Sequence, residues 1–275
     1  MKNVLISCLL LFFVQGMCAQ EYFQSTRLQK VWETPVGLET PESAYYHKPS
    51  GKIYVSNIVG KSWEKDSLGF ISIITAKGEF VKLKWVEGLH ASKGIAIYKQ
   101  KLFVADIDRL VEIDLVSGKI IKTYTHTKAV NLNDVAVDKD GLVYVSDSKN
   151  KCLFYLKADS LQLFLESEEL VRLNGIFIEG NQLLCGTNDS KFIAIDKNTK
   201  TISVIRTDVP YIDGLIKVGK GKYIASNFKG LIVSLDVKKG VDKLLDATIA
   251  KVNAADLGYI KKRKLILVPT FNDNK

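Results

Sequence analysis

The sequence has little of what would place it in a specialised class of proteins. Only 5 of its 275 residues are proline, 3 are histidine and 4 are cysteine. No apolar run reaches the roughly 20 residues that a membrane-spanning helix needs. No CxxC pair or zinc-finger spacing occurs, and no stretch shows sustained helical periodicity. These absences exclude a disordered or collagen-like chain, a polytopic membrane protein and a helical repeat protein.

Basic residues outnumber acidic ones, with 39 Lys and Arg against 30 Asp and Glu, which gives a formal net charge of +9. The densest basic cluster, Lys261–Lys264, lies between two apolar stretches. It is accompanied by no aromatic RNA-binding motif and no basic helix. We therefore interpret the cluster as a solvated turn and expect no nucleic-acid partner.

The first residues have the order of a secretory signal peptide. Lys2 is followed by the apolar run Val4–Val14 and then by a short segment that ends in the small residue Ala19. We predict that residues 1–19 are a signal peptide and that residues 20–275 are an exported, periplasmic or secreted protein. Lipoprotein anchoring at Cys18 is the less favoured alternative, because the residues before it make a poor lipobox.

Two cysteines remain after the predicted cleavage, in a compartment that would permit a disulfide. Cys152 and Cys185 each lie in a separate apolar, strand-like stretch. We therefore predict two buried thiols in preference to a disulfide.

One sequence pattern occurs six times, at intervals of about 40 residues. Each unit begins with an opening pair of polar or small residues, continues into an apolar strand and a polar turn, and returns in a second strand. The six opening pairs are Glu42-Ser43, Lys93-Gly94, Asn133-Asp134, Asn174-Gly175, Asp213-Gly214 and Ala255-Asp256. Four short strands per interval are typical of a propeller blade. The sequence therefore predicts an all-β fold, a six-bladed β-propeller with four-stranded antiparallel blades around a central channel.

The two ends of this array depart from the regular pattern. An insertion around Val59–Leu68 lengthens the first interval, and we predict that it forms a loop over one face. Only two strands of the sixth unit precede Lys275, so we expect the last blade to be incomplete at the C-terminus. We predict that Leu28–Glu33 serves as the outermost strand of blade six, because closure removes exposed strand edges.

The first residue of each opening pair is a candidate for a shared site, because the first strand of every propeller blade lines the channel. Four of the six residues at this position carry side-chain oxygen atoms. Calcium takes about six to eight oxygen ligands, whereas zinc prefers His or Cys. We therefore predict a divalent cation, with calcium favoured, at the channel mouth; the alternative is that these residues only form turns. The predicted metal ligands are Glu42, Asn133, Asn174 and Asp213.

These openings also carry a resemblance to a known family, in the segments Pro41-Glu42, Leu132-Asn133-Asp134, Leu173-Asn174-Gly175 and Ile212-Asp213-Gly214. Over about residues 35–272 the chain resembles the senescence marker protein/gluconolactonase/regucalcin family. More broadly, it is similar to the calcium-dependent phosphotriesterase superfamily, which includes the paraoxonases. The resemblance implies a six-bladed propeller that hydrolyses lactones or related esters with a divalent cation. It also implies that Asn133 is a ligand or substrate contact and that Asp213 is the general base.

Two positions near the site depart from the pattern of that family. Asn131 stands where regucalcin-like members have a substrate-contacting Arg, and Lys93 stands where the paraoxonases have a His. Lys93 is therefore a second candidate catalytic residue, which would act as a neutral base, swing away, or replace the cation by pairing with Glu42 and Asp213. The candidate substrate-binding residues are Asn133, Asn131, His90 and Trp63.

The leading interpretation is an exported, monomeric propeller enzyme without a transmembrane segment, a metal-dependent hydrolase of lactones or related esters. The cation would polarise the carbonyl group, and Asp213 would orient or deprotonate the attacking water. The alternative is a non-catalytic periplasmic or cell-surface propeller that binds a glycan, a peptide or a protein. In that case Lys93, Glu42 and Asp213 would form a buried charge cluster that holds the blades together.

Overall fold

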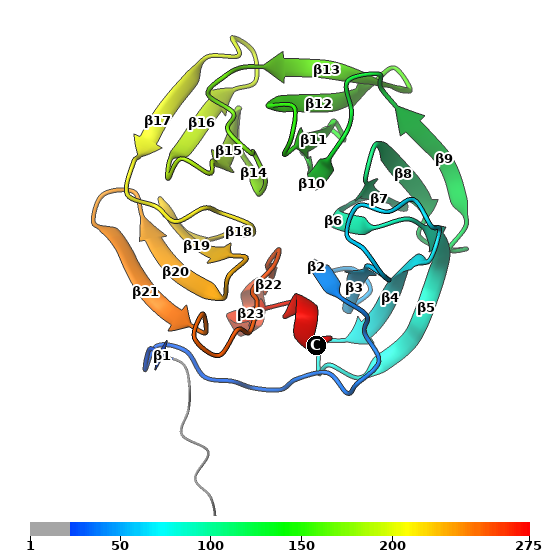
Figure 1. Ribbon diagram of the computed structural model, residues 1–275, viewed down its shortest axis with the longest axis horizontal. Helices are drawn as coiled ribbons and strands as arrows, with labels where there is room; N and C mark the ends of the chain where they lie inside the picture. The colour runs from blue at the N-terminus through cyan, green and yellow to red at the C-terminus, as the bar shows by residue number, and fades with distance from the viewer. Residues whose placement is uncertain (1–22) are drawn as a thin grey trace, which may run out of the picture.

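Antiparallel sheets follow one another around a central axis in the computed structural model, which describes residues 23–275 (Figure 1). The predicted signal peptide, residues 1–19 with Cys18 and Ala19, lies outside the described residues. Within the described range, no helix is long and apolar enough to cross a membrane. The helices of this range are the short 3-10 turns η1 (Lys261–Arg263) and η2 (Phe271–Asp273).

Five blades have four antiparallel strands each, which confirms a β-propeller of four-stranded blades. Blade one contains β2 (Pro41–His47), β3 (Lys52–Asn57), β4 (Gly69–Thr75) and β5 (Phe80–Leu89). Blade two contains β6 (Ser92–Tyr98), β7 (Lys101–Asp106), β8 (Arg109–Asp114) and β9 (Ile120–Thr125). Blade three contains β10 (Leu132–Val137), β11 (Val143–Asp147), β12 (Cys152–Lys157) and β13 (Ser160–Glu166). Blade four contains β14 (Ile176–Glu179), β15 (Gln182–Gly186), β16 (Phe192–Asp196) and β17 (Ile202–Arg206). Blade five contains β18 (Leu215–Gly219), β19 (Lys222–Asn227), β20 (Leu231–Asp236) and β21 (Gly240–Asp246).

The prediction of six four-stranded blades is wrong for the last unit. This sixth unit contains only β22 (Gly258–Ile260) and β23 (Leu265–Leu267). The predicted outermost strand, Leu28–Glu33, is also wrong, because these residues form no strand. Instead, β1 (Phe23–Gln24) pairs with β21 and adds a fifth strand to the sheet of blade five.

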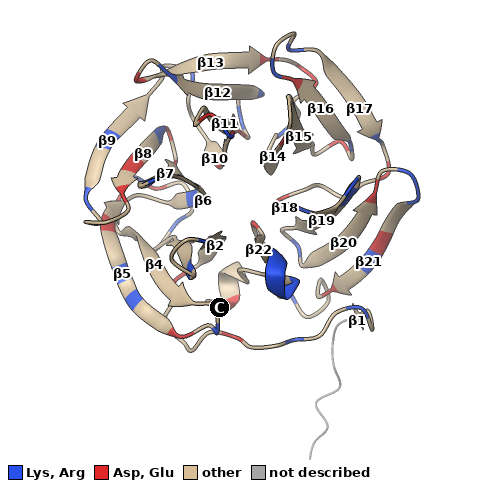
Figure 2. Ribbon diagram, turned by 180° about the vertical axis from the view of Figure 1, so that it is seen from behind, with Lys and Arg blue, Asp and Glu red and all other residues tan. Residues whose placement is uncertain are grey.

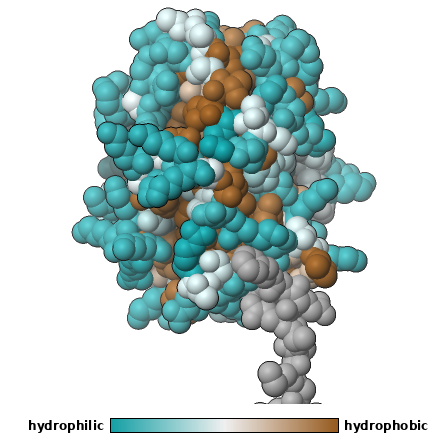
Figure 3. Space-filling model, turned by 90° about the vertical axis from the view of Figure 1, so that its left-hand side faces the viewer, coloured by the Kyte–Doolittle hydropathy of each residue, from teal (hydrophilic) through white to brown (hydrophobic). Residues whose placement is uncertain are grey.

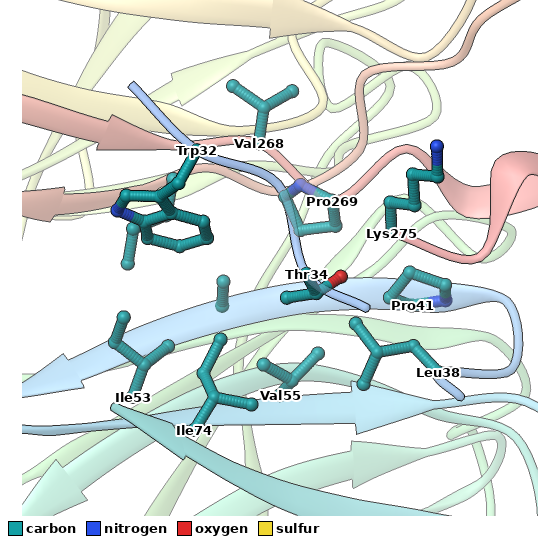
Figure 4. Close-up of a pocket in the computed structure, with 12 residues that line it drawn as sticks. Trp32, Thr34, Leu38, Pro41, Ile53, Val55, Ile74, Val268, Pro269 and Lys275 are labelled. Atoms are coloured by element: carbon teal, nitrogen blue, oxygen red, sulfur yellow. The ribbon is translucent and has the colours of Figure 1, made fainter. Parts of the chain in front are cut away.

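The segment between β1 and β2 covers the outer side of the sixth unit as coil (Figure 1). Leu28 packs on the apolar cluster between blade five and the sixth unit, and Trp32 packs on the cluster between the sixth unit and blade one. Figure 4 shows Trp32 and Pro269 above Ile53 and other apolar side chains of blade one, around a cavity of about 40 Å³. The segment thus shields apolar surface that two further strands would otherwise cover.

Apolar side chains fill the space between every pair of neighbouring blades. Six such clusters join blade one to blade two and so on around the ring, including both neighbours of the two-stranded sixth unit. The largest fully buried side chains include Phe70, Phe154 and Phe192, near the start of the third strand of their blades. Burial of a side chain of this size contributes roughly 1.5–3 kcal/mol. The ring is therefore closed by side-chain packing even where a blade is short of strands.

The structure agrees with two further predictions, one about the basic cluster and one about the cysteines. The basic cluster Lys261–Lys264 is exposed in and after η1, seen as a blue turn on the rear face in Figure 2. Figure 3 shows a rim that is mostly hydrophilic, with separate hydrophobic patches. Cys152 and Cys185 are both buried and form no disulfide, which confirms the prediction of two thiols.

The first strands approach one another so closely that three openings require glycine. A Cβ atom on Gly94 would lie 2.4 Å from Asp134 Oδ1, and one on Gly214 would lie 2.2 Å from the backbone nitrogen of Leu257. A Cβ atom on Gly175 would lie 2.3 Å from the backbone oxygen of Asp213. None of the three glycines has a left-handed φ. They are therefore required by the lack of space between blades, and turn formation does not explain them.

We predict that Gly214→Ala destabilises the protein, because the added methyl group would collide with the backbone of the sixth unit. Overpacking of this kind costs about 1–3 kcal/mol. Gly219→Ala, at the end of the same strand, is the matched control, since its nearest neighbour would be 3.6 Å away. Urea unfolding should show a lower midpoint for Gly214→Ala than for Gly219→Ala; equal midpoints would contradict the close approach.

Candidate functional site

Irregularities at the start of the first strands position the candidate residues. The register of β2 with β3 shifts between Pro41 and Ser43, and Glu42 lies at this shift. Corresponding shifts occur where Lys93 begins blade two and where Asn133 begins blade three. A β-bulge bends the strand and redirects a side chain. The bulges therefore place Glu42, Lys93 and Asn133 at the end of the channel where the first strands begin, which we call the channel mouth.

A serine in the second strand holds each of three opening pairs in place. Its hydroxyl oxygen accepts a hydrogen bond from the backbone N–H of the second residue of the pair. The donor and acceptor pairs are Ser43 and Ser56 at 3.0 Å, Asp134 and Ser146 at 2.9 Å, and Gly214 and Ser226 at 2.8 Å. The serine therefore recurs in the second strand because its hydroxyl group supports the opening pair.

In blades two and three, the aspartate that ends the second strand holds the connection before the opening. The Asp106 carboxylate accepts hydrogen bonds from the backbone N–H groups of His90 and Ala91. The Asp147 carboxylate likewise accepts from Val130 and Asn131. These buried acids therefore hold the chain just ahead of Lys93 and Asn133 and are structural.

Three ionisable residues from separate blades lie buried within electrostatic reach of one another. The exposed fractions are 5% for Glu42, 3% for Lys93 and 3% for Asp213. Burial raises the pKa of Glu42 well above its usual range, and nearby Lys93 opposes this. Burial also raises the pKa of Asp213 to about 7, opposed by Lys93 and by a hydrogen bond from Asn174. Burial lowers the pKa of Lys93, against the attraction of Glu42 and Asp213.

The amide residues of the predicted set are also buried at this level. Asn174 Nδ2 donates a hydrogen bond to Asp213 Oδ1, which joins blades four and five. Asn133 is 7% exposed. Within residues 23–275, no side-chain hydrogen bond links Asn133 to the other candidates, so its role as a ligand or substrate contact stays a prediction.

The charges in this cluster are incompletely paired. Glu42 Oε2 is buried without a hydrogen-bond partner among the described residues. The Lys93 ammonium lies 4.2 Å from the centre of the Trp63 ring. Among the described residues, the Lys93 ammonium forms no ion pair. A buried carboxylate oxygen therefore lacks the donor that buried polar atoms normally have.

Aromatic side chains cover the channel mouth. Trp63 comes from the predicted insertion, which forms the loop between β3 and β4 and passes over β6 and β7 in Figure 1. Phe271 of η2 packs against a small apolar cluster of blades one and two, and its ring lies 4.9 Å from the ring of Phe228 in blade five. Phe271 has a φ of 53°, which a bulky residue adopts only where its surroundings hold it. The mouth is thus bordered by side chains from several blades.

Two residues that were predicted to contact the substrate form hydrogen bonds with residues outside the candidate cluster. The ring nitrogen Nδ1 of His90 accepts a hydrogen bond from the backbone N–H of Ser67 at 3.1 Å. Asn131 donates its backbone N–H to Asp147 at 3.1 Å. Both residues precede an opening pair, but their roles in substrate binding stay predictions.

The sequence reasoning missed two acids deeper in the channel, of which Asp134 is buried and Asp256 is half-buried. Asp134 and Asp256 line a central cavity of about 330 Å³ that is formed by the first strands of all six units. Asp134 Oδ2 accepts a hydrogen bond from the backbone N–H of Ile176 at 2.7 Å, and Ser43 Oγ donates to Asp256 Oδ2 at 2.5 Å. Each acid thus contacts a neighbouring blade. The available signal was the second position of the opening pair, which is otherwise Ser or Gly.

The donor set limits which metal ions could bind. No group of three or more His, Cys, Asp or Glu side chains suited to a metal occurs between residues 23 and 275. Protein ligands at the mouth would therefore be the carboxylates of Glu42 and Asp213 together with amide oxygens. Such an all-oxygen set suits Ca²⁺ or Mg²⁺ better than Zn²⁺.

Comparisons with known proteins agree with this architecture. Residues 131–154, which include β10 and β11, match the NHL repeat family. The chain is similar to a structure described as streptogramin B lyase, with a TM-score of 0.61 and 11% identity over 88% of this chain and 97% of that one. It is also similar to a catalytically inactive variant of virginiamycin B lyase from Staphylococcus aureus with quinupristin, with a TM-score of 0.58 and 14% identity over 84% and 92%. No curated protein matches the chain.

The chain has a propeller fold. At these identities, the two solved structures show the likeness of the fold alone, and the NHL match spans part of blade three. The comparisons support a propeller in general and do not single out the regucalcin and gluconolactonase family.

We predict that Asp256 makes the metal-free protein less stable as the pH rises. Burial raises its pKa from 3.8 to about 7, with Asp213 adding to the effect; Glu42 and Asp134 also lie within electrostatic reach. Between about pH 4 and pH 7 the folded state binds the proton more strongly, so this contribution is lost with rising pH. Asp256→Asn removes it while retaining an acceptor for Ser43.

The free energy of unfolding should be measured in EDTA at pH 5 and pH 8 for the wild type and for Asp256→Asn. The wild type should lose more stability than the variant between these two pH values. Parallel losses would show that Asp256 is ionised at both.

Proposed function

We propose that this protein is an exported, divalent-cation-dependent hydrolase of lactones or related esters, with Ca²⁺ as the favoured ion at the channel mouth. The observation that carries the proposal is the unpaired Glu42 Oε2, which is buried within electrostatic reach of Asp213. Burial of a charged group without a partner is strongly unfavourable. A cation that both carboxylates contact would remove this penalty.

The residues present fit such a cation. Glu42 and Asp213 would supply the charged oxygens, and Asn133 and Asn174 would supply amide oxygens, which is the mixture that calcium accepts. When bound, the cation would polarise the ester carbonyl and stabilise the negative charge that develops on its oxygen. The proposal includes membership of the senescence marker protein/gluconolactonase/regucalcin family. It also includes a ring of six units.

The protein's own side chains would carry the proton transfers. Asn174 fixes the Asp213 carboxylate through its hydrogen bond, and in this role Asp213 orients the attacking water and accepts its proton. Lys93 would donate a proton to the departing alkoxide, since a lowered pKa makes its ammonium a better acid. Asn133, Asn131, His90 and Trp63 would contact the substrate. The protein would act as a monomer in the periplasm or outside the cell.

A second candidate function is a non-catalytic propeller in which Glu42, Lys93 and Asp213 only hold the blades together. The mutual influence of these three buried groups favours it. It differs from the first candidate in one respect that can be measured: the charge cluster would need no metal ion.

We predict that Glu42→Gln and Asp213→Asn each abolish the tight binding of one calcium ion per protein, because each removes a charged ligand. Asp140→Asn, at an exposed turn, is the matched control and should bind calcium like the wild type. Isothermal titration of the EDTA-treated protein measures this directly. Wild-type protein that binds no calcium would contradict the proposed function and favour the second candidate.

A panel of lactones and esters tests the reaction class. Glu42→Gln and Asp213→Asn should lose about a hundredfold or more of any turnover, while Asp140→Asn should retain it. Because the similar solved structures are described as lyases, the reaction should be run in isotopically labelled water. Hydrolysis incorporates the label into the product, whereas an elimination leaves the product unlabelled and would contradict a hydrolase.

A further inference from the structure

Lys93 occupies an unexpected position for a buried ammonium. Two buried carboxylates, Glu42 and Asp213, attract it, yet its Nζ lies over the Trp63 ring and forms no ion pair within the described range. Elsewhere in the protein a largely buried lysine does pair, as Lys197 does with Asp138 at 2.8 Å. Lys197 Nζ also lies 5.8 Å from the centre of the Tyr144 ring, so Lys93 differs in having its ring closer, at 4.2 Å, and in forming no ion pair.

The loop that carries Trp63 is anchored to blade two and to the connection between blades one and two. Lys65 in this loop forms an ion pair with Asp108 of blade two. Ser67, also in the loop, donates its backbone N–H to His90 Nδ1. Among blades one to five, only blade one has such an insertion between its second and third strands. These contacts hold Trp63 over Lys93.

We propose that Trp63 is a positioning residue that holds the Lys93 ammonium away from Glu42 and Asp213, so that these carboxylates remain available to a divalent cation. This inference rests on the proposed function. An ammonium ion and a divalent cation compete for the same carboxylates, and a lysine side chain is long enough to change partners. An aromatic face attracts an ammonium most strongly where water is excluded. The indole therefore offers Lys93 a second partner that carries no negative charge.

The exposure of the two side chains agrees with this arrangement. Lys93 is 3% exposed, whereas Trp63 is 43% exposed. One face of the indole covers the ammonium, and the remainder of the ring faces solvent at the mouth. Asp106 also attracts Lys93 but is already paired with Arg109. Removal of Trp63 would therefore leave Glu42 and Asp213 as the available partners of Lys93, which would then occupy the place of the cation.

The experiment is a calcium titration of four EDTA-treated full-length variants compared with the wild type. Trp63→Ala should weaken calcium binding by about tenfold or more, and Trp63→Phe should retain most of the affinity because it keeps an aromatic face. The double variant Trp63→Ala/Lys93→Met should regain calcium affinity, because no ammonium remains to compete. Leu68→Ala, an exposed apolar residue of the same loop, is the matched control and should bind like the wild type.

The outcomes separate the inference from the proposed function. A wild type that binds no calcium would overturn the proposed function and the inference with it. Calcium binding that Trp63→Ala leaves unchanged would overturn the inference alone. A loss in Trp63→Ala that persists in the double variant would also overturn it, since the loop and not Lys93 would then be responsible.

A second readout does not depend on calcium. The side-chain protons of Lys93 next to its ammonium should show an upfield ring-current shift in the NMR spectrum of the wild type in EDTA. The shift should disappear in Trp63→Ala and remain in Leu68→Ala. An unshifted Lys93 in the wild type would show that the ammonium does not lie on the ring.

Discussion

The structure depends on the close approach of six first strands around one axis. The backbone of one blade comes so near to the next that openings such as Gly175 and Gly214 have no space for a side chain. Because the strands converge, a residue that a bulge turns toward the axis enters a space shared with residues of other blades. Glu42, Lys93 and Asp213 are therefore buried together although they lie far apart in the sequence.

This convergence also determines the electrostatics of the channel. Glu42, Asp134 and Asp213 are buried along it and Asp256 is half-buried, and desolvation raises the pKa of each carboxyl group. Lys217 at the channel wall is already paired with Glu179. Lys93 balances the negative charge of these carboxylates only weakly, because burial lowers the pKa of its ammonium group. In the proposed function, a cation at the mouth would balance the carboxylates; without it, the raised pKa values favour protonation of these groups.

The repeat in the sequence predicted the blades because each blade must bury the same two faces and turn at the same intervals. It also predicted that one residue per opening pair would reach the axis, and Glu42, Lys93 and Asp213 do come together there. Asp134 and Asp256 were missed, because only the first residue of each opening pair was considered as a candidate for the site. Nothing local in the sequence distinguishes a side chain at the mouth from one a step deeper in the channel.

The sixth unit shows the limit of local patterns. Leu28 and Trp32 have the alternation of an outer strand, but they pack as coil against two interblade clusters. Apolar residues that cover a sheet edge without hydrogen bonds have the same composition as a strand that pairs with it. Whether the chain pairs or only packs is decided by tertiary contacts, and here β1 pairs with blade five instead.

The most direct test of this account is the anomalous diffraction of crystals soaked with manganese(II), which accepts the same oxygen ligands as calcium. The account predicts a single strong peak at the channel mouth, in contact with Glu42 Oε2 and an oxygen of Asp213, with the Lys93 ammonium still on the Trp63 ring. A mouth without a peak, in which Lys93 bridges the two carboxylates, would contradict it.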